Sequence, residues 1–182
     1  MACGQDDGLK DIRRLYADTN DKIAKSKLPG DEGWGNLHSN ELTVNSNKGS
    51  WRAVGNYSNK VTFWYKDQPG FDDEKGKSAY AELVKIEIET IAAARRYVEE
   101  YLYDDGKLLF CYKTAISETK GNKEYRYYFR DGKLFRYQED QDVIKDLRKA
   151  GAKQITDKSL KLQKLFLLTF DCEAYVPPPT PP

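Results

Sequence analysis

The chain has little of the chemistry that metal and nucleotide sites require. Its 182 residues include one histidine and three cysteines. A site built from several histidines is therefore excluded, and no Cys-x-x-Cys pair or acidic loop with calcium-binding spacing occurs. The glycines around Trp34 lack the strand-to-helix context of phosphate-binding loops and dinucleotide fingerprints. We therefore expect neither a metal site nor a cofactor.

Net charge and long apolar runs are also missing. The 30 basic and 29 acidic residues give a net charge of +1, which offers no electrostatic attraction for nucleic acid or an anionic membrane. The longest apolar stretches, residues 91–94 and 165–168, fall far below the roughly 18 residues that span a bilayer. We expect no nucleic-acid partner and no membrane-spanning helix.

Groups suited to catalysis are scarce. A serine–histidine–acid triad would have to use His38, which lies in a polar segment. Carboxylates paired for sugar hydrolysis could come from predicted strands, but strand surfaces carry such residues routinely: Glu87, Glu89, Glu99 and Glu100. The sequence favours a protein that binds rather than catalyses. The alternative is a small hydrolase or isomerase with its pocket between sheet and helices.

Aromatic residues are abundant, with 13 Tyr, 7 Phe and 3 Trp, and they favour strands. Two Asp-Gly pairs, Asp105-Gly106 and Asp131-Gly132, lie between alternating apolar runs and predict two-residue hairpin turns in which both residues take positive φ. That register places six apolar residues on one face of the first hairpin: Tyr97, Tyr101, Tyr103, Leu108, Phe110 and Tyr112. A three-residue turn with a glycine bulge would scatter them between the faces.

The remaining elements follow from periodicity. Strands are expected at 41–46, at 51–55 and 61–66 as a hairpin with its turn at 56–60, and at 82–89, where Val84, Ile86 and Ile88 share a buried face. Residues 91–98 have a helix-forming composition but precede a turn, so we predict a strand from about Arg95. Helices are expected at 8–28, at 142–149 and from about 157 to 170, the last carrying Leu160, Leu167 and Leu168.

These elements predict an α+β fold. We expect a twisted antiparallel sheet of about six to eight strands, a meander with Asp-Gly hairpins, covered on one face by the N- and C-terminal helices. One domain spans residues 8–175, after a tether of residues 1–7 and before a proline-rich, disordered tail of residues 176–182; residues 67–78 form a polar loop. Cys111 and Cys172 are either bridged or two small buried side chains.

Exposed aromatic residues on a curved sheet can stack on sugar rings or pack against a protein. The candidates for such a ligand-binding face are aromatic and basic residues of the predicted strands: Trp51, Trp64, Tyr128, Phe135, Tyr137, Arg126 and Arg130. We expect the ligand to be a protein or a glycan. Ordinary burial of these side chains in the core is the alternative.

The first residues suggest where in the cell the protein is located. Met1-Ala2-Cys3-Gly4 resembles the end of a lipoprotein signal, and Gln5-Asp6-Asp7 resembles an acidic export tag. The stretches 12–17, 94–104 and 127–134 are similar to uncharacterised lipoproteins of the Bacteroidetes. The resemblance implies lipid attachment at Cys3 and anchoring in the bacterial cell envelope, on the periplasmic or surface side of the outer membrane, with the lipid as the sole membrane contact. It implies no site residues, and a purely structural envelope subunit stays open, as does an incidental Cys3.

Overall fold

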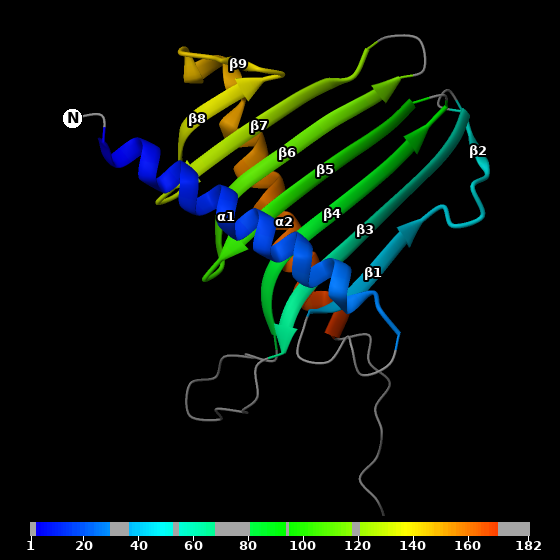
Figure 1. The fold of residues 1–182 in the computed structure, drawn as a ribbon. Helices are drawn as coiled ribbons and strands as arrows, with labels where there is room; N and C mark the ends of the chain where they lie inside the picture. Colours follow the sequence, from blue (N-terminus) through cyan, green and yellow to red (C-terminus); the bar gives the residue numbers. More distant parts are fainter. Residues whose placement is uncertain are drawn as a thin grey trace, which may run out of the picture.

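One antiparallel sheet between two helices makes up the fold (Figure 1). The computed structural model describes residues 3–29, 37–52, 55–67, 81–93, 95–117 and 121–170. The helices are α1 (Cys3–Ser26), α2 (Ala152–Phe170) and the short 3-10 helix η3 (Leu147–Ala150). The strands are β1 (His38–Val44), β2 (Ser50–Trp51), β3 (Gly55–Asp67), β4 (Ala81–Ala92), β5 (Arg95–Asp104), β6 (Lys107–Ser117), β7 (Lys123–Arg130), β8 (Lys133–Glu139) and β9 (Asp142–Val143).

The sheet is a meander. Of the nine strands among the described residues, eight follow the order β1-β3-β4-β5-β6-β7-β8-β9, and β2 pairs with β3 beyond the end of β1. This confirms the predicted α+β class with an antiparallel sheet. Both Asp-Gly turns have the expected two-residue form, because Asp105 (φ 48°), Gly106 (φ 69°), Asp131 (φ 50°) and Gly132 (φ 71°) all take positive φ.

Three one-residue β-bulges interrupt the pairing. Trp64 pairs with Lys85 while Tyr65 pairs with Leu83, so Val84 has no partner in β3. Leu109 and Phe135 are skipped in the same way in β6 and β8. A bulge places the extra residue and its successor on one face. The prediction that Val84 shares a face with Ile86 and Ile88 is therefore wrong, and so is the single-face arrangement of the first hairpin. Leu83, Ile86 and Ile88 share the larger core, whereas Val84 packs with Ile23 of α1.

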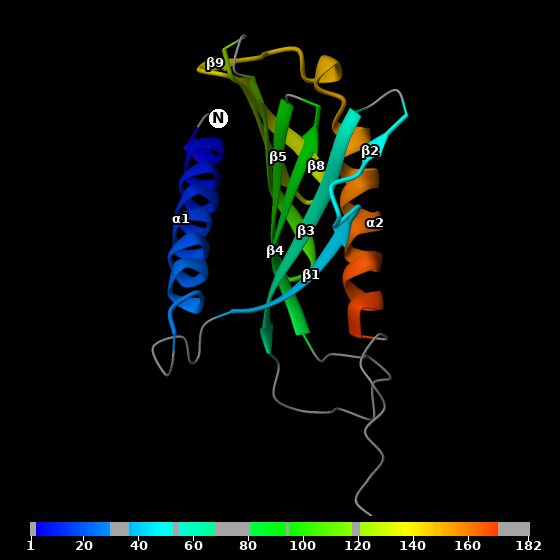
Figure 2. The same ribbon diagram turned by 90° about the vertical axis from the view of Figure 1, so that its right-hand side faces the viewer.

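The two long helices lie on opposite faces of the sheet (Figure 2), which corrects the prediction that both cover one face. The α2 face carries the larger core, which includes Phe63, Ile86, Tyr101 and Phe129 together with Leu162 and Phe166 of α2. The α1 face carries two smaller clusters: Leu9, Ile12, Leu102, Phe110 and Tyr128 form one, and Ile23, Leu37, Trp64 and Val84 form the other. Because the strands present apolar residues on both sides, each face needs a helix to cover it.

Both helices begin earlier than their periodicity predicts. The first starts at Cys3 instead of residue 8, and the second starts at Ala152, after Gly151 in a left-handed conformation, instead of near residue 157. In α2 the buried positions are Ile155, Ser159, Leu162 and Phe166, whereas the apolar positions expected from the sequence, Leu160, Leu167 and Leu168, are exposed. In the described part of the chain no helix is long and apolar enough to cross a membrane.

Other local predictions meet mixed outcomes. Residues 56–60 are part of β3 rather than a turn, and residues 95–98 are strand, as expected. The helix predicted at 142–149 is reduced to η3, because Asp142 and Val143 pair with β8 as β9. Cys111 is a free, buried thiol. Cys172, the tail 176–182 and, after Asp67, the polar loop lie outside the described residues.

Candidate functional site

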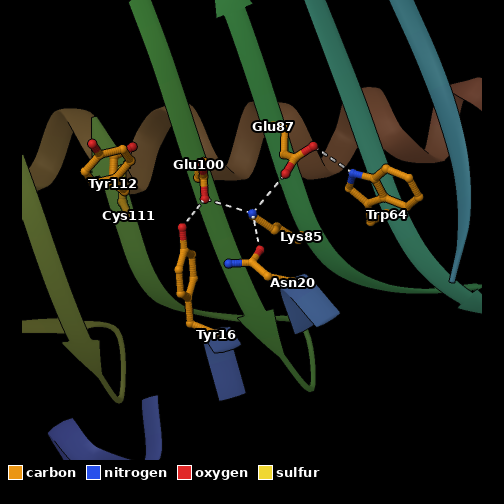
Figure 3. A network of polar contacts seen from close by, with 8 residues as sticks. All are labelled: Tyr16, Asn20, Trp64, Lys85, Glu87, Glu100, Cys111 and Tyr112. Carbon is orange, nitrogen blue, oxygen red and sulfur yellow. Dashed lines mark hydrogen bonds and ion pairs between the residues drawn. The ribbon is translucent and has the colours of Figure 1, made fainter. Parts of the chain in front are cut away.

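A buried lysine joins α1 to the centre of the sheet (Figure 3). The Lys85 side chain is only 2 % exposed. Its Nζ donates to Oδ1 of Asn20 at 2.7 Å and contacts carboxylate oxygens of Glu87 at 2.9 Å and Glu100 at 2.8 Å. The bulge at Val84 turns Lys85 toward α1, where its ammonium lies 5.0 Å from the centre of the Tyr16 ring. A buried ammonium needs such partners because its desolvation is costly.

The two carboxylates of this network have further donors. The Tyr16 hydroxyl donates to Glu100 at 2.6 Å, and the indole N–H of Trp64 donates to Glu87 at 3.0 Å. Burial acts to raise the pKa of Glu87, but the charge and hydrogen bond of Lys85 and the bond from Trp64 outweigh it, so the pKa lies below its usual value. Burial and the Glu100 charge raise the pKa of Tyr16. The network thus holds the Glu87 carboxylate ionised and the Tyr16 phenol protonated.

The network continues as a polar row across the α1 face. Strand pairing places Glu87 opposite Glu100, Glu100 opposite Tyr112, Tyr112 opposite Arg126 and Arg126 opposite Gln138. The Tyr112 hydroxyl donates to Glu124 at 3.0 Å, and the Arg126 guanidinium lies 5.5 Å from the Tyr112 ring centre. The row therefore leads from the buried lysine to the β7–β8 end of the sheet.

A cavity lies at that end of the row, between α1 and strands β6 to β8. We call it the α1 pocket. Its volume is about 320 Å³, and it is lined by Ile12, Arg13, Tyr16, Phe110, Arg126, Tyr128, Gln138, Asp140 and Gln141. This volume is at the lower end of the range for small-molecule sites. Its rings are fixed against one another: Phe110 lies 5.3 Å from Tyr16 and 4.9 Å from Tyr128, measured between ring centres.

One unpartnered polar atom belongs to the lining of this pocket. In the described part of the chain, two buried side-chain polar atoms have no hydrogen-bond partner, Oε1 of Gln138 and Nε of Arg136. Gln138 is 8 % exposed and lines the pocket. Arg136, paired with Tyr128, is two residues away on the same face of β8. Buried polar atoms are normally hydrogen-bonded, so an exception beside a cavity marks a place where an external partner can bind.

The charged groups of the pocket are largely engaged with one another. Arg126 pairs with Glu124 and also donates from Nη1 to the carbonyl oxygen of Asp140 at 2.9 Å. The Asp140 carboxylate accepts from the backbone N–H of Glu124 at 2.8 Å. Arg13 is exposed at the α1 side. Arg126 and Asp140 are therefore positioned before any ligand arrives.

A second hollow lies on the opposite, α2 face. It has a volume of about 520 Å³ and is lined by Thr90, Tyr97, Glu99, Lys113, Thr114, Ala115, Tyr125 and Tyr127. Its carboxylate is already satisfied, because Glu99 accepts from Lys158 at 2.8 Å and from the Tyr101 hydroxyl at 2.7 Å. This hollow is larger than the α1 pocket, but neither of the two unpartnered atoms belongs to its lining.

The structure scatters the residues predicted to bind ligand. Arg126 and Tyr128 line the α1 pocket. Phe135 packs on Tyr128, and the guanidinium of Arg130 lies 4.9 Å from the Phe135 ring centre, next to the backbone of Gly8. The other three lie elsewhere. Trp64 is buried beneath α1, Tyr137 is buried on the α2 face against Tyr127, and Trp51 is exposed on β2 and packs on Tyr57.

Sequence reasoning missed the α1 side of the pocket and Gln138. Ile12 and Tyr16 lie within the helix predicted at 8–28, and a glutamine in a strand carries no signal of burial. A signal did exist in the register, because the confirmed Asp131-Gly132 turn brings β7 and β8 together and places Gln138 opposite Arg126. Placing Gln138 opposite Arg126 from the sequence would also have required knowing the position of the bulge at Phe135.

Among the described residues, no group of three or more His, Cys, Asp or Glu side chains is arranged to hold a metal ion. Comparisons with protein-family models, with curated proteins and with solved structures give no match.

Proposed function

We propose that this chain is a ligand-binding protein and that the α1 pocket is its binding site. The observation that carries the proposal is the Gln138 amide oxygen, which is buried at the pocket wall without a hydrogen-bond partner. A buried acceptor without a hydrogen bond costs free energy, and a donor group on a ligand would recover that free energy. Aromatic walls with a few convergent polar groups are the usual composition of a small-molecule site.

The chemistry of the pocket supports binding over catalysis. A pocket between sheet and helix is where the hydrolase alternative would also place its active site. The lining carboxylate, Asp140 in the turn after β8, accepts from the backbone N–H of Glu124, and the Tyr16 phenol donates to Glu100 and is kept protonated. General acid–base catalysis needs groups whose pKa lies near the working pH. The Tyr16 phenol, whose pKa is raised, does not meet this need, and the hydrogen bond to Asp140 fixes the shape of the pocket.

We further propose that the protein is carried on the bacterial cell envelope by a lipid on Cys3. Helix α1 begins at this residue. At a rise of about 1.5 Å per residue, Arg13 follows about 15 Å along the helix axis. A lipid at Cys3 would therefore hold the α1 pocket close to the membrane surface. Several acyl chains on one residue anchor a protein stably.

The proposed location and lipid attachment are tested by mass spectrometry of the protein isolated from its native cells. A diacylglyceryl mass on the Cys3 peptide would support the envelope proposal, and an unmodified Cys3 would refute it. This result does not depend on what the pocket binds.

Binding is tested by ligand-observed NMR with the full chain and mixtures of sugars, nucleosides and amino acids. A hit should bind Gln138→Leu at least tenfold more weakly, because a leucine cannot accept the hydrogen bond. The matched control is Gln154→Leu, an exposed glutamine on α2, which should bind as the unaltered protein does. Equal binding by both variants would place the ligand elsewhere.

A further inference from the structure

The chemistry of the α1 pocket specifies a class of ligand, on the premise that this pocket is the binding site proposed above. We infer that the α1 pocket binds a neutral saccharide of one or two rings, with a hydroxyl group donating to Gln138 and an apolar ring face packed on Phe110 and Tyr128.

The unpartnered atom of the pocket wall, Oε1 of Gln138, accepts a hydrogen bond. A hydroxyl group both donates and accepts, so one hydroxyl of a saccharide can donate to this oxygen. The other hydroxyls can bond to the remaining polar lining residues, Asp140 and Gln141. A ligand with acceptors only would leave Oε1 of Gln138 unpaired.

The part of the sheet beside Gln138 is apolar and rigid. Phe110 and Tyr128 are buried, their ring centres are 4.9 Å apart, and Ile12 of α1 lies across the same cavity. An ordered aromatic wall loses little entropy when a ligand packs on it. Saccharides are amphipathic in the matching way, since the C–H groups of a ring face are apolar and the hydroxyls lie at the ring edge.

The charge of the pocket favours a neutral ligand. Its ionised lining groups are Arg13, Arg126 and Asp140, and Glu124 is paired with Arg126. Two guanidinium groups thus face two carboxylates, so a carboxylate or phosphate on the ligand would find no surplus positive charge. The volume of about 320 Å³ lies at the lower end of the range for small-molecule sites, which suits a ligand of one or two rings.

The test is isothermal titration calorimetry of the full chain with defined sugars. The neutral set is glucose, galactose, mannose, N-acetylglucosamine, cellobiose and maltose. The comparison set is glucuronate, glucose 6-phosphate, adenosine and tryptophan. We expect at least one neutral sugar to bind, and its affinity to fall at least tenfold in Gln138→Leu and to stay unchanged in Gln154→Leu. A second variant at the exposed rim, Arg13→Ala, should weaken binding at least threefold without altering the fold.

The outcomes separate the two proposals. Binding of an acidic sugar, adenosine or tryptophan more tightly than any neutral sugar, with the same dependence on Gln138, would overturn the saccharide inference and keep the α1 pocket as a binding site. No binding by any probe, together with a crystal structure in which only water contacts Gln138, would overturn both. A neutral sugar that binds Gln138→Leu as tightly as the unaltered protein would also overturn both.

Discussion

Replacing Lys85 with methionine tests whether the buried network holds α1 on the sheet. Methionine keeps the length and apolar stem of the lysine but leaves the carboxylates of Glu87 and Glu100 without their shared cation. The lysine side chain is 2 % exposed, and those of Glu100 and Glu87 are 16 % and 32 % exposed. Removing one partner of a buried ion pair costs about 3–5 kcal/mol. Because Glu87 can still reach water, we expect a loss of about 3 kcal/mol in the free energy of unfolding.

The assay is urea denaturation followed by tryptophan fluorescence, because Trp64 donates to Glu87. The matched control is Lys66→Met, which removes an exposed lysine that lies 3.1 Å from Glu82. Exposed pairs contribute about 0–1 kcal/mol. The double variant Lys85→Met/Glu100→Gln should recover about 1–2 kcal/mol, since it removes one of the stranded carboxylates.

The loss should also depend on pH. In the unaltered protein Lys85 helps to hold the Glu87 pKa below its unfolded value, so this stabilisation is present above about pH 4 and disappears as the pH falls through the folded pKa. Without Lys85 the burial of Glu87 dominates and its folded pKa rises, so the variant is penalised most at neutral pH. The difference between the two proteins should shrink toward about pH 4. A Lys85→Met protein within 1 kcal/mol of Lys66→Met at neutral pH would refute the reasoning.

Three further predictions concern the α2 face and the turns. Phe166→Ala should lower the free energy of unfolding by about 3–5 kcal/mol, because this ring is 2 % exposed and packs among three other rings. Leu167→Ala, at a side chain 54 % exposed, should lower it by about 0.5 kcal/mol or less. Equal losses in urea denaturation would contradict our assignment of the buried helix face. Gly106→Ala should lower the free energy of unfolding by about 1–2 kcal/mol, because its φ of 69° is strained for alanine, although the new Cβ meets no atom within 4 Å. A thermal melt with an unchanged midpoint would contradict this. Burial acts to raise the pKa of Glu99, but Lys158 and Tyr101 outweigh it and the pKa lies below its usual value, so the stabilisation from Glu99 should be lost as the pH falls below about 4. Lys158→Ala should reduce this loss of unfolding free energy at acid pH, and an unchanged pH dependence would exclude the interaction.

Local sequence signals predicted the elements but not their faces. Asp105-Gly106 and Asp131-Gly132 identified the hairpins, because positive φ at two successive residues is a demand that few sequences meet. The positions of the bulges could not be predicted, since Val84, Leu109 and Phe135 look like ordinary strand residues. Each bulge reverses the alternation on one side of it. Faces assigned from simple alternation were therefore wrong beyond these points, and the second core and the position of α1 were missed.

The candidate site was harder to predict than the fold. Arg126 and Tyr128 were named as candidates because they are basic and aromatic residues of a predicted strand, and both line the α1 pocket. Lys85 read as the solvent side of an alternating strand, since a lysine is rarely buried. Its burial depends on Asn20 and Glu100, which approach it from α1 and β5. Convergence of distant segments leaves no local pattern in the sequence.

The bulges have a consequence at the level of the coding sequence. Each extra residue is one codon, and all three codons specify apolar side chains that face α1: Val84 in the cluster with Ile23, and Leu109 and Phe135 beside the cluster of Leu9 and Ile12. Deleting these codons would restore uninterrupted alternation in β4, β6 and β8 and keep the residues of the α2 core in place. The same deletions would remove three of the side chains on which α1 rests. Single-codon insertions and deletions in these strands are thus a route by which the fold could gain or lose its α1 layer, and with it the pocket, while the larger core is kept.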